Sequence, residues 1–296
     1  MTGGVKAAFG WSDYEVIATG GGEKLERWGE LVLLRPDPQA IWDPPYELKN
    51  SKNINARYIR SQNGGGAWEY KGKVPQEFVI GRGDLKFSCK LMGFKHTGLF
   101  PEQAVNWDAM RALISGAGRQ IRVLNLFAYT GGASVACAKA GAHVTHVDAA
   151  KAMVERAKTN AALSGIEREK MRYIVDDCAA FVARELRRGN SYDAVIMDPP
   201  SYGRGPSGEV WRTQEDLFAF VRETVKLLSD KPLFVLINSY TTGLQPTVIA
   251  NILSLTLPQA RVEAYELALP TGDKRVLLPC GCSGMATFAR EASEIR

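Results

Sequence analysis

The sequence predicts an α/β protein: a doubly wound, seven-stranded, mostly parallel sheet, preceded by a small β-rich N-terminal domain. Three observations predict this fold class. From residue 121 onward, short apolar runs typical of buried strands alternate with segments of helical periodicity. The first 104 residues instead contain short strands bounded by glycine turns. The last two strands, Arg261–Leu269 and Met285–Arg290, are joined by too short a link for a crossover helix, which favours a closing antiparallel hairpin.

The first strand of the sheet, which begins near Val123, leads into the turn Thr130-Gly131-Gly132. An alanine-rich helix follows directly and is stopped by Gly141. A strand that ends in a glycine-rich turn before a helix N-terminus is typical of a cofactor crevice in an open α/β sheet. Glycine lets the backbone approach a ligand closely, and the free N–H groups of the helix favour anionic groups.

The second strand, His143–Val147, ends in Asp148. The interval from Gly131 is 148 − 131 = 17 residues, close to the ~20 that place an acid at a nucleoside ribose in such units. A carboxylate accepts two hydrogen bonds from a ribose diol, so this residue type suits the position. The sequence therefore predicts a nucleoside-containing cofactor.

The remaining elements alternate as a doubly wound fold requires. In chain order they are a helix over 150–164, a strand over Arg172–Val175 followed by Asp176 and Asp177, a helix over 179–188, a strand over Asp193–Met197 followed by Asp198-Pro199-Pro200-Ser201-Tyr202, a helix over 214–228, a strand over Leu233–Asn238 and a helix over 246–257.

We expect two domains, 1–104 and 105–296, with the boundary before a helix over Val105–Ile114. The first domain mixes aromatic and basic residues, and this mixture has two interpretations. It forms an RNA-binding surface of stacking rings and phosphate-binding cations, or its rings fill a small core while its charges are solvated. The residues concerned are Trp28, Tyr58, Trp68 and Tyr70 with Arg27, Arg57, Arg60, Lys71 and Lys73.

Composition is that of an ordinary globular protein, with 45% hydrophobic and 23% charged residues among 296 and a net charge of +5. This mild charge permits a polyanionic partner without requiring one. No apolar run is long enough to span a membrane, and the N-terminus lacks a signal-peptide core, so we expect a cytoplasmic protein with reduced thiols. The five cysteines and three histidines show no metal-ligand spacing, so we expect no metal.

Two motifs carry a family resemblance: Asn125-Leu126-Phe127-Ala128-Tyr129-Thr130-Gly131-Gly132, and Asp198-Pro199-Pro200 at the fourth strand. With Asp148 and Asp177, the chain resembles a class I S-adenosylmethionine-dependent methyltransferase. More narrowly, residues 80–290 resemble the ribosomal RNA large-subunit methyltransferases that make 5-methylcytosine or 7-methylguanosine. The Gly-x-Gly-x-x-Gly pattern of nicotinamide-binding proteins is absent from the turn.

The resemblance implies a role for each motif residue. Asp148 would bind the ribose and Asp177 the adenine amino group, with Asp176 as the competing choice. Asp198 and the Pro199 carbonyl would meet the acceptor group, and Tyr202 would stack on a target base. The remaining cofactor contacts would come from Phe127, Tyr129, Thr130, Gly131, Ala149 and Asp198, with Phe100 and Gln103 from a loop before the sheet.

The chain departs from the 5-methylcytosine branch, which carries a nucleophilic cysteine just beyond the fifth strand. Here Asn238-Ser239-Tyr240 stands at that place. A carbon acceptor needs covalent activation by a thiolate, so we expect a nitrogen or oxygen acceptor instead. Residues 203–212, rich in glycine, are expected to form a mobile lid or an ordinary connector.

Three functions stay open at this point. The first is methylation of RNA, ribosomal RNA above all. The second is methylation of a small molecule or protein, which the modest charge permits. The third is a non-catalytic RNA-binding protein that keeps the fold.

Overall fold

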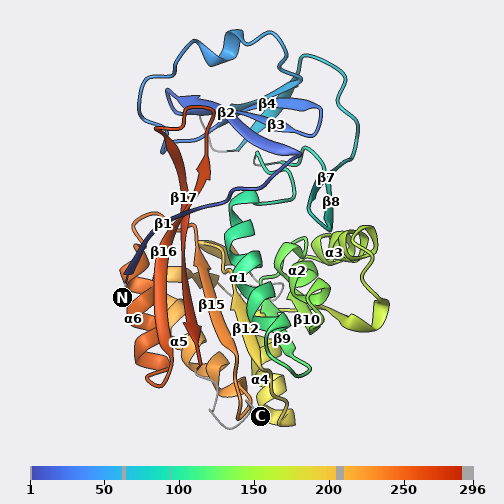
Figure 1. The fold of residues 1–296 in the computed structure, drawn as a ribbon, viewed down its shortest axis with the longest axis vertical. Coiled ribbons are helices and arrows are strands. Elements are labelled where there is room, and N and C mark those ends of the chain that lie inside the picture. The colour runs from blue at the N-terminus through green and yellow to red at the C-terminus, as the bar shows by residue number, and fades with distance from the viewer. Residues whose placement is uncertain (1, 62–64, 94, 205–209, 289–296) are drawn as a thin grey trace. The chain divides into compact units, whose positions relative to one another are not determined.

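A computed structural model describes residues 2–61, 65–93, 95–204 and 210–288 (Figure 1). Its contacts divide the chain into two compact units. One, the α/β unit, comprises Met1–Lys6, Asn106–Leu267 and Gly281–Arg296, and the other, the β-rich unit, comprises Ala7–Val105 and Ala268–Cys280. This division differs from a single cut after residue 104 in the first six residues, in Val105 and in residues 268–280 of the last hairpin.

The α/β unit contains an eight-stranded sheet in the order β1-β16-β17-β15-β12-β9-β10-β11. Strands β9, β10, β11, β12 and β15 pair in parallel, and β17 runs antiparallel to β15. The strands are β1 (Thr2–Ala7), β9 (Arg122–Leu126), β10 (His143–Asp148), β11 (Met171–Val175), β12 (Ala194–Met197), β15 (Phe234–Ser239), β16 (Arg261–Pro270) and β17 (Leu277–Thr287). The doubly wound fold and its closing hairpin are confirmed. The sheet has one strand more than expected, because β1 lies beside β16.

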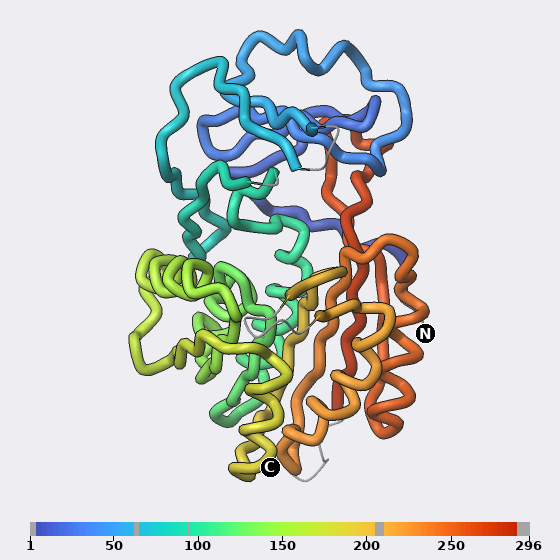
Figure 2. Tube along the Cα trace, turned by 180° about the vertical axis from the view of Figure 1, so that it is seen from behind, coloured from blue at the N-terminus to red at the C-terminus, as the bar shows by residue number. Residues whose placement is uncertain are grey.

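Helices cover both faces of this sheet. Figure 1 shows α1 and α2 in front of it, and the view from behind shows α5 and α6 on the opposite face (Figure 2). The helices on the second of these faces pack against side chains of the central strands. Together they form one apolar core, which includes Phe181, Phe220 and Leu253. The helices are α1 (Ala104–Ser115), α2 (Gly132–Lys139), α3 (Lys151–Leu163), α4 (Cys178–Arg188), α5 (Thr213–Thr224) and α6 (Pro246–Thr256).

A short hairpin forms where the sequence indicated a lid or connector. Its strands are β13 (Tyr202–Arg204) and β14 (Val210–Arg212), which pair antiparallel. The part of the expected lid between them, residues 205–209, lies outside the described residues. So do the last two residues of the expected final strand.

The β-rich unit contains a five-stranded sheet in the order β2-β3-β4-β5-β6 and a separate hairpin. Its strands pair antiparallel except β4 with β5, which run parallel. They are β2 (Tyr14–Gly20), β3 (Glu23–Trp28), β4 (Leu31–Pro36), β5 (Ala56–Arg60) and β6 (Gly66–Tyr70), with β7 (Phe78–Arg82) and β8 (Leu85–Cys89) in the hairpin.

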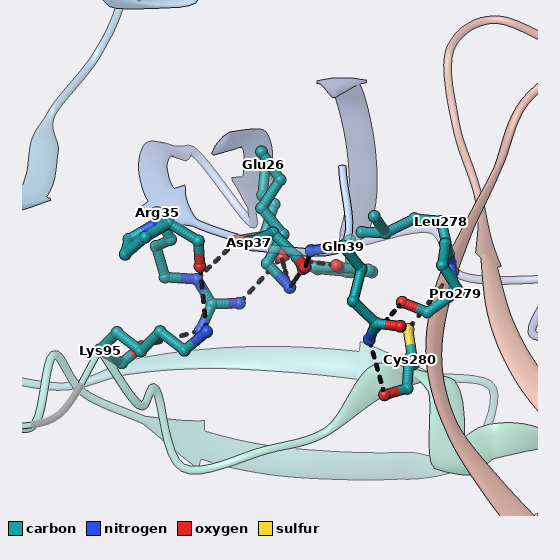
Figure 3. A network of polar contacts seen from close by, with 11 residues as sticks. Glu26, Arg35, Asp37, Gln39, Lys95, Leu278, Pro279 and Cys280 are labelled. Atoms are coloured by element: carbon teal, nitrogen blue, oxygen red, sulfur yellow. Dashed lines mark hydrogen bonds and ion pairs between the residues drawn. The ribbon is translucent and has the colours of Figure 1, made fainter. Parts of the chain in front are cut away.

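A buried ion-pair network lies in the β-rich unit (Figure 3). The Glu26 carboxylate, fully shielded from solvent, accepts from Arg35 Nε at 2.6 Å and Nη2 at 2.8 Å, and from the Tyr14 hydroxyl at 2.7 Å. Burial by itself raises the pKa of Glu26, but the charges of Arg35 and Lys24 outweigh it and lower that pKa to about 2. The group therefore stays ionised, as a buried carboxylate does only when paired.

The aromatic residues of this unit favour the core interpretation. Trp28 is 0% exposed and Tyr58 is buried, so neither ring is available for stacking on RNA. Trp68 is half-buried, and its indole N–H donates to the Met92 carbonyl at 2.7 Å. Of the four predicted rings, Tyr70 alone is exposed. RNA binding by this unit therefore rests on one ring and stays a prediction.

Candidate active site

The site lies where the strand order reverses in the α/β unit. β9 pairs with β10 on one side and with β12 on the other, so Leu126 lies beside both Val147 and Met197. The carboxyl ends of these parallel strands therefore meet at one edge of the sheet, where ligands bind in open α/β folds. The turn after β9, the acid ending β10 and the Asp198 loop are brought together there, as the sequence predicted.

The turn after β9 has an unusual backbone. Phe127 (φ 55°), Tyr129 (φ 50°) and Gly131 (φ 85°) all lie in the left-handed region. That conformation costs roughly 1–2 kcal/mol for each residue with a Cβ atom. It is held by hydrogen bonds from the Ala128 amide to the Val147 carbonyl (3.0 Å) and from the Tyr129 amide to Asp148 Oδ2 (2.8 Å). Strain of this kind is characteristic of ligand-binding sites.

Gly131 is required by packing as well as by its φ. A Cβ atom there would lie 2.9 Å from Cβ and 3.3 Å from Cα of Ala157 in α3. The sequence argument used this glycine for close approach to a ligand. In the structure, its missing side chain lets the start of α2 approach α3.

Polar side chains behind the turn hold it in place, and sequence reasoning missed them. Asn160 Nδ2 donates to the Thr130 carbonyl at 2.8 Å. Asn125 Nδ2 donates to Ser134 Oγ (2.8 Å), which lies 3.0 Å from His146 Nδ1. Burial lowers the pKa of His146 to about 4, which keeps the ring neutral.

The Asp148 carboxylate faces the turn. Its Oδ2 accepts from the Tyr129 amide and its Oδ1 from the Ala150 amide, each at 2.8 Å, while Ala149 between them is exposed. Burial raises the pKa of Asp148, and these two hydrogen bonds offset part of that rise. Each carboxylate oxygen has a second lone pair, so the group accepts a ribose diol without losing its backbone partners. These acceptor oxygens thus fit the hydroxyls of a nucleoside.

Two acids follow β11 and have different partners. Asp177 is the N-cap of α4 and accepts from the Ala180 amide at 2.8 Å through Oδ1. Asp176 forms an ion pair with Arg184. The charge of Asp176 is thereby neutralised, whereas the cap occupies one oxygen of Asp177. This difference favours Asp177 as the acceptor for an adenine amino group.

The Asp198-Pro199-Pro200 segment follows β12 directly. The Asp198 amide donates to the Leu126 carbonyl at 3.4 Å, which ties the segment to the end of β9. The Pro200 carbonyl accepts from Trp211 Nε1 (2.8 Å) and Thr213 Oγ1 (2.7 Å). Two side chains thus saturate the Pro200 carbonyl oxygen, which leaves it no lone pair for a substrate.

Two predicted cofactor residues, Phe100 and Gln103, belong to the β-rich unit. Phe100 precedes a short 3₁₀ helix, Pro101–Gln103, and the Gln103 amide donates to its carbonyl at 3.1 Å. Their role in cofactor binding stays a prediction.

Four of the five thiols have raised pKa values. Burial raises the pKa of Cys137 to about 12 and that of Cys282 to about 11, and it also raises the pKa values of Cys178 and Cys280. Cys89 is buried as well. In the described part of the chain, no three His, Cys, Asp or Glu side chains gather as a metal site would require.

Comparisons with known proteins agree with this geometry. The family model for S-adenosylmethionine-dependent methyltransferases matches residues 60–245. A crystal structure of the SAM-dependent methyltransferase from Agrobacterium tumefaciens superimposes with a TM-score of 0.90 at 32% identity, covering 96% of this chain and 93% of that one. The tRNA m1G37 methyltransferase of M. jannaschii shares the fold, with a TM-score of 0.53 at 15% identity over 94% of this chain and 75% of that one.

Curated relatives are much longer than this chain. Ribosomal RNA large subunit methyltransferase K/L of Shewanella frigidimarina is 31% identical over 205 residues, 69% of this chain and 27% of that protein. Its counterpart in Shewanella baltica strain OS155 is 34% identical over 154 residues, 52% and 20% of the two chains. The chain thus spans about a quarter of the relatives that it matches.

The chain belongs to the S-adenosylmethionine-dependent methyltransferase family. The predicted class I fold, enzyme class and cofactor are confirmed. Among the residues that the structure describes, no helix is both long and apolar enough for a membrane span.

Proposed function

We propose that this methyltransferase modifies RNA, ribosomal RNA in particular, at a nitrogen acceptor. One observation carries the proposal: the Asp198-Pro199-Pro200 segment lies at the cofactor turn and leads directly into an exposed tyrosine, Tyr202. That combination suits an extruded base, whose amino group meets the acidic segment while its ring stacks. The names of the Shewanella relatives support RNA as the substrate class.

We assign the cofactor to the edge formed by the turn and the two acids. The backbone of Phe127, Tyr129, Thr130 and Gly131 would line its methionine portion, and Asp148 beside Ala149 would bind the ribose hydroxyls. Asp177 would accept from the adenine amino group. Phe100 and Gln103 complete the proposed set, together with Asp198 on the acceptor side.

S-Adenosylmethionine supplies an activated methyl group for a single in-line displacement. The protein then mainly orients the acceptor and excludes water. The Asp198 carboxylate and the Pro199 carbonyl accept the N–H groups of the target amine and aim its lone pair. As the nitrogen–carbon bond forms, the carbon–sulfur bond breaks and S-adenosylhomocysteine leaves as a neutral thioether. The nitrogen becomes cationic, and Asp198 would take its proton. Pro200 has no part in this, because its carbonyl already has two donors.

The state of the thiols supports a nitrogen rather than a carbon acceptor. Methylation of cytosine C5 needs a thiolate that adds to the ring. Burial raises the pKa of Cys282, which lies opposite Ser239 at the end of β15, to about 11, and its thiol donates to the Leu244 carbonyl at 3.2 Å. Such a group is protonated at neutral pH and has no role as a nucleophile.

The test uses RNA from a strain of the source organism lacking this protein. Purified protein and labelled S-adenosylmethionine are added to its ribosomal RNA, and nucleosides are then identified by mass spectrometry. We expect one new N-methylated nucleoside with wild-type protein and none with Asp198→Ala. Label in RNA with both proteins would refute the role of Asp198. A C-methylated nucleoside would refute the nitrogen acceptor, and no transfer to RNA would favour a small molecule or protein, which the net charge of +5 permits.

A further inference from the structure

The β13–β14 hairpin presents two different faces. Side chains that are paired across two antiparallel strands lie on the same face. The register pairs Gly203 with Trp211, and on the opposite face it pairs Tyr202 with Arg212 and Arg204 with Val210. Exposure follows the same division, since the two central residues are half-buried and the other four are exposed.

The inner face anchors the hairpin at the site. The Trp211 ring lies 5.3 Å from that of Phe127 in the cofactor turn and 5.4 Å from that of Phe220 in α5, measured between centroids. Its indole N–H donates to the Pro200 carbonyl. The hairpin is thus fixed both to the turn and to the acidic segment, so its outer face has a defined place beside the acceptor.

The outer face combines a ring with an oriented cation. Tyr202 is 52% exposed, and its hydroxyl accepts from Arg204 Nε at 2.9 Å. Within the described ranges, the structure shows no carboxylate paired with Arg204, whereas Arg212 on the same face lies 3.2 Å from Glu215. Counting described residues alone, Arg204 has no carboxylate partner while Arg212 has one, and the Tyr202 hydroxyl holds the Arg204 guanidinium.

We propose that Tyr202 and Arg204 act as one nucleotide clamp, in which the ring stacks on a base while the guanidinium pairs with a phosphate of the same strand. Base stacking on an aromatic ring and phosphate pairing with arginine are the two contacts that bind single-stranded RNA. This inference rests on the proposed function, because it takes RNA as the methyl acceptor. It adds that the protein binds the RNA strand through a stacking contact and an ionic contact, which a single hydrogen bond joins.

Fluorescence anisotropy with a short, labelled, single-stranded RNA of mixed sequence tests the clamp across a salt series. Tyr202→Leu should weaken binding by about 5- to 100-fold, because it removes the stacking ring together with the hydroxyl that holds Arg204. Arg204→Gln should reduce the slope of log K against log salt by about 0.7, the value for one phosphate contact on a single strand. Tyr202→Phe keeps the ring but releases the arginine, so its loss should be smaller than that of Tyr202→Leu.

Arg222→Gln is the matched control, because Arg222 is an exposed arginine on α5 outside the hairpin. It should bind RNA as wild type does, and melting temperatures of all variants establish that each is folded. Wild-type affinity and slope in both Tyr202→Leu and Arg204→Gln would overturn the clamp, as would an equal slope change in Arg222→Gln. If these results accompany normal transfer of methyl groups to RNA, the proposed function survives. Absence of RNA binding and transfer in wild type would overturn both.

Discussion

Replacement of Gly131 by alanine should destabilise the protein far more than a glycine-to-alanine change normally does. The left-handed backbone there costs a residue with a Cβ atom roughly 1–2 kcal/mol. The new methyl group would also lie 2.9 Å from Cβ and 3.3 Å from Cα of Ala157. These atoms belong to α3 and yield little, so overpacking adds about 1–3 kcal/mol. The free energy of unfolding should therefore fall by about 2–5 kcal/mol.

Gly189→Ala provides the control. Gly189 has a similar φ of 68°, but nothing lies within 4 Å of the position of its Cβ atom. Only the backbone cost of roughly 1–2 kcal/mol applies there. Urea denaturation of the two variants, with titration of S-adenosylhomocysteine, measures the difference. Gly131→Ala should also lose ligand affinity, whereas Gly189→Ala should keep it. Equal losses of stability, or unchanged affinity in Gly131→Ala, would refute the packing argument.

Three further changes test other parts of the site. Burial lowers the pKa of His146 to about 4, so below the ordinary pKa of about 6.5 the unfolded state binds more protons than the folded state. The free energy of unfolding should therefore fall by about 2 kcal/mol as the pH is lowered from about 7 to about 5. Urea denaturation at several pH values should show that His146→Gln lacks this pH-dependent loss. Cys282→Ser should retain methyl transfer. A folded but inactive variant would instead indicate that the Cys282 thiol acts as a nucleophile. Asp177→Asn keeps the helix cap but should weaken cofactor binding by calorimetry, whereas Asp176→Asn should not; the reverse order would make Asp176 the adenine ligand.

The main strands of the sheet were predictable because each has a residue pattern that can be recognised within its own segment. Apolar runs and intervening helices predict β9, β10, β11, β12 and β15 directly, and the short last link predicts the hairpin of β16 and β17. β1 was missed because Thr2–Ala7 contains two glycines and no apolar alternation, so only pairing with β16 makes it a strand. Pairing between residues so far apart in the chain cannot be recognised from the residues of β1 alone.

The site was predictable to the same degree. The glycine-rich turn and Asp148 follow from spacing and residue type, and they do meet at one sheet edge. Trp211 was not foreseen as an anchor, because its contact with Phe127 joins residues far apart in sequence. Nor was the saturation of the Pro200 carbonyl, which depends on the hairpin folding back.

Titration calorimetry with S-adenosylhomocysteine tests most directly whether the turn and Asp148 hold the cofactor. Wild-type protein and Asp176→Asn should bind it with equal affinity. Asp148→Asn should bind at least about tenfold more weakly, because a charged acceptor contributes about 1.5–3 kcal/mol to its hydrogen bonds. A folded Asp148→Asn protein that binds as tightly as wild type would contradict the assignment, and so would a wild-type protein that does not bind.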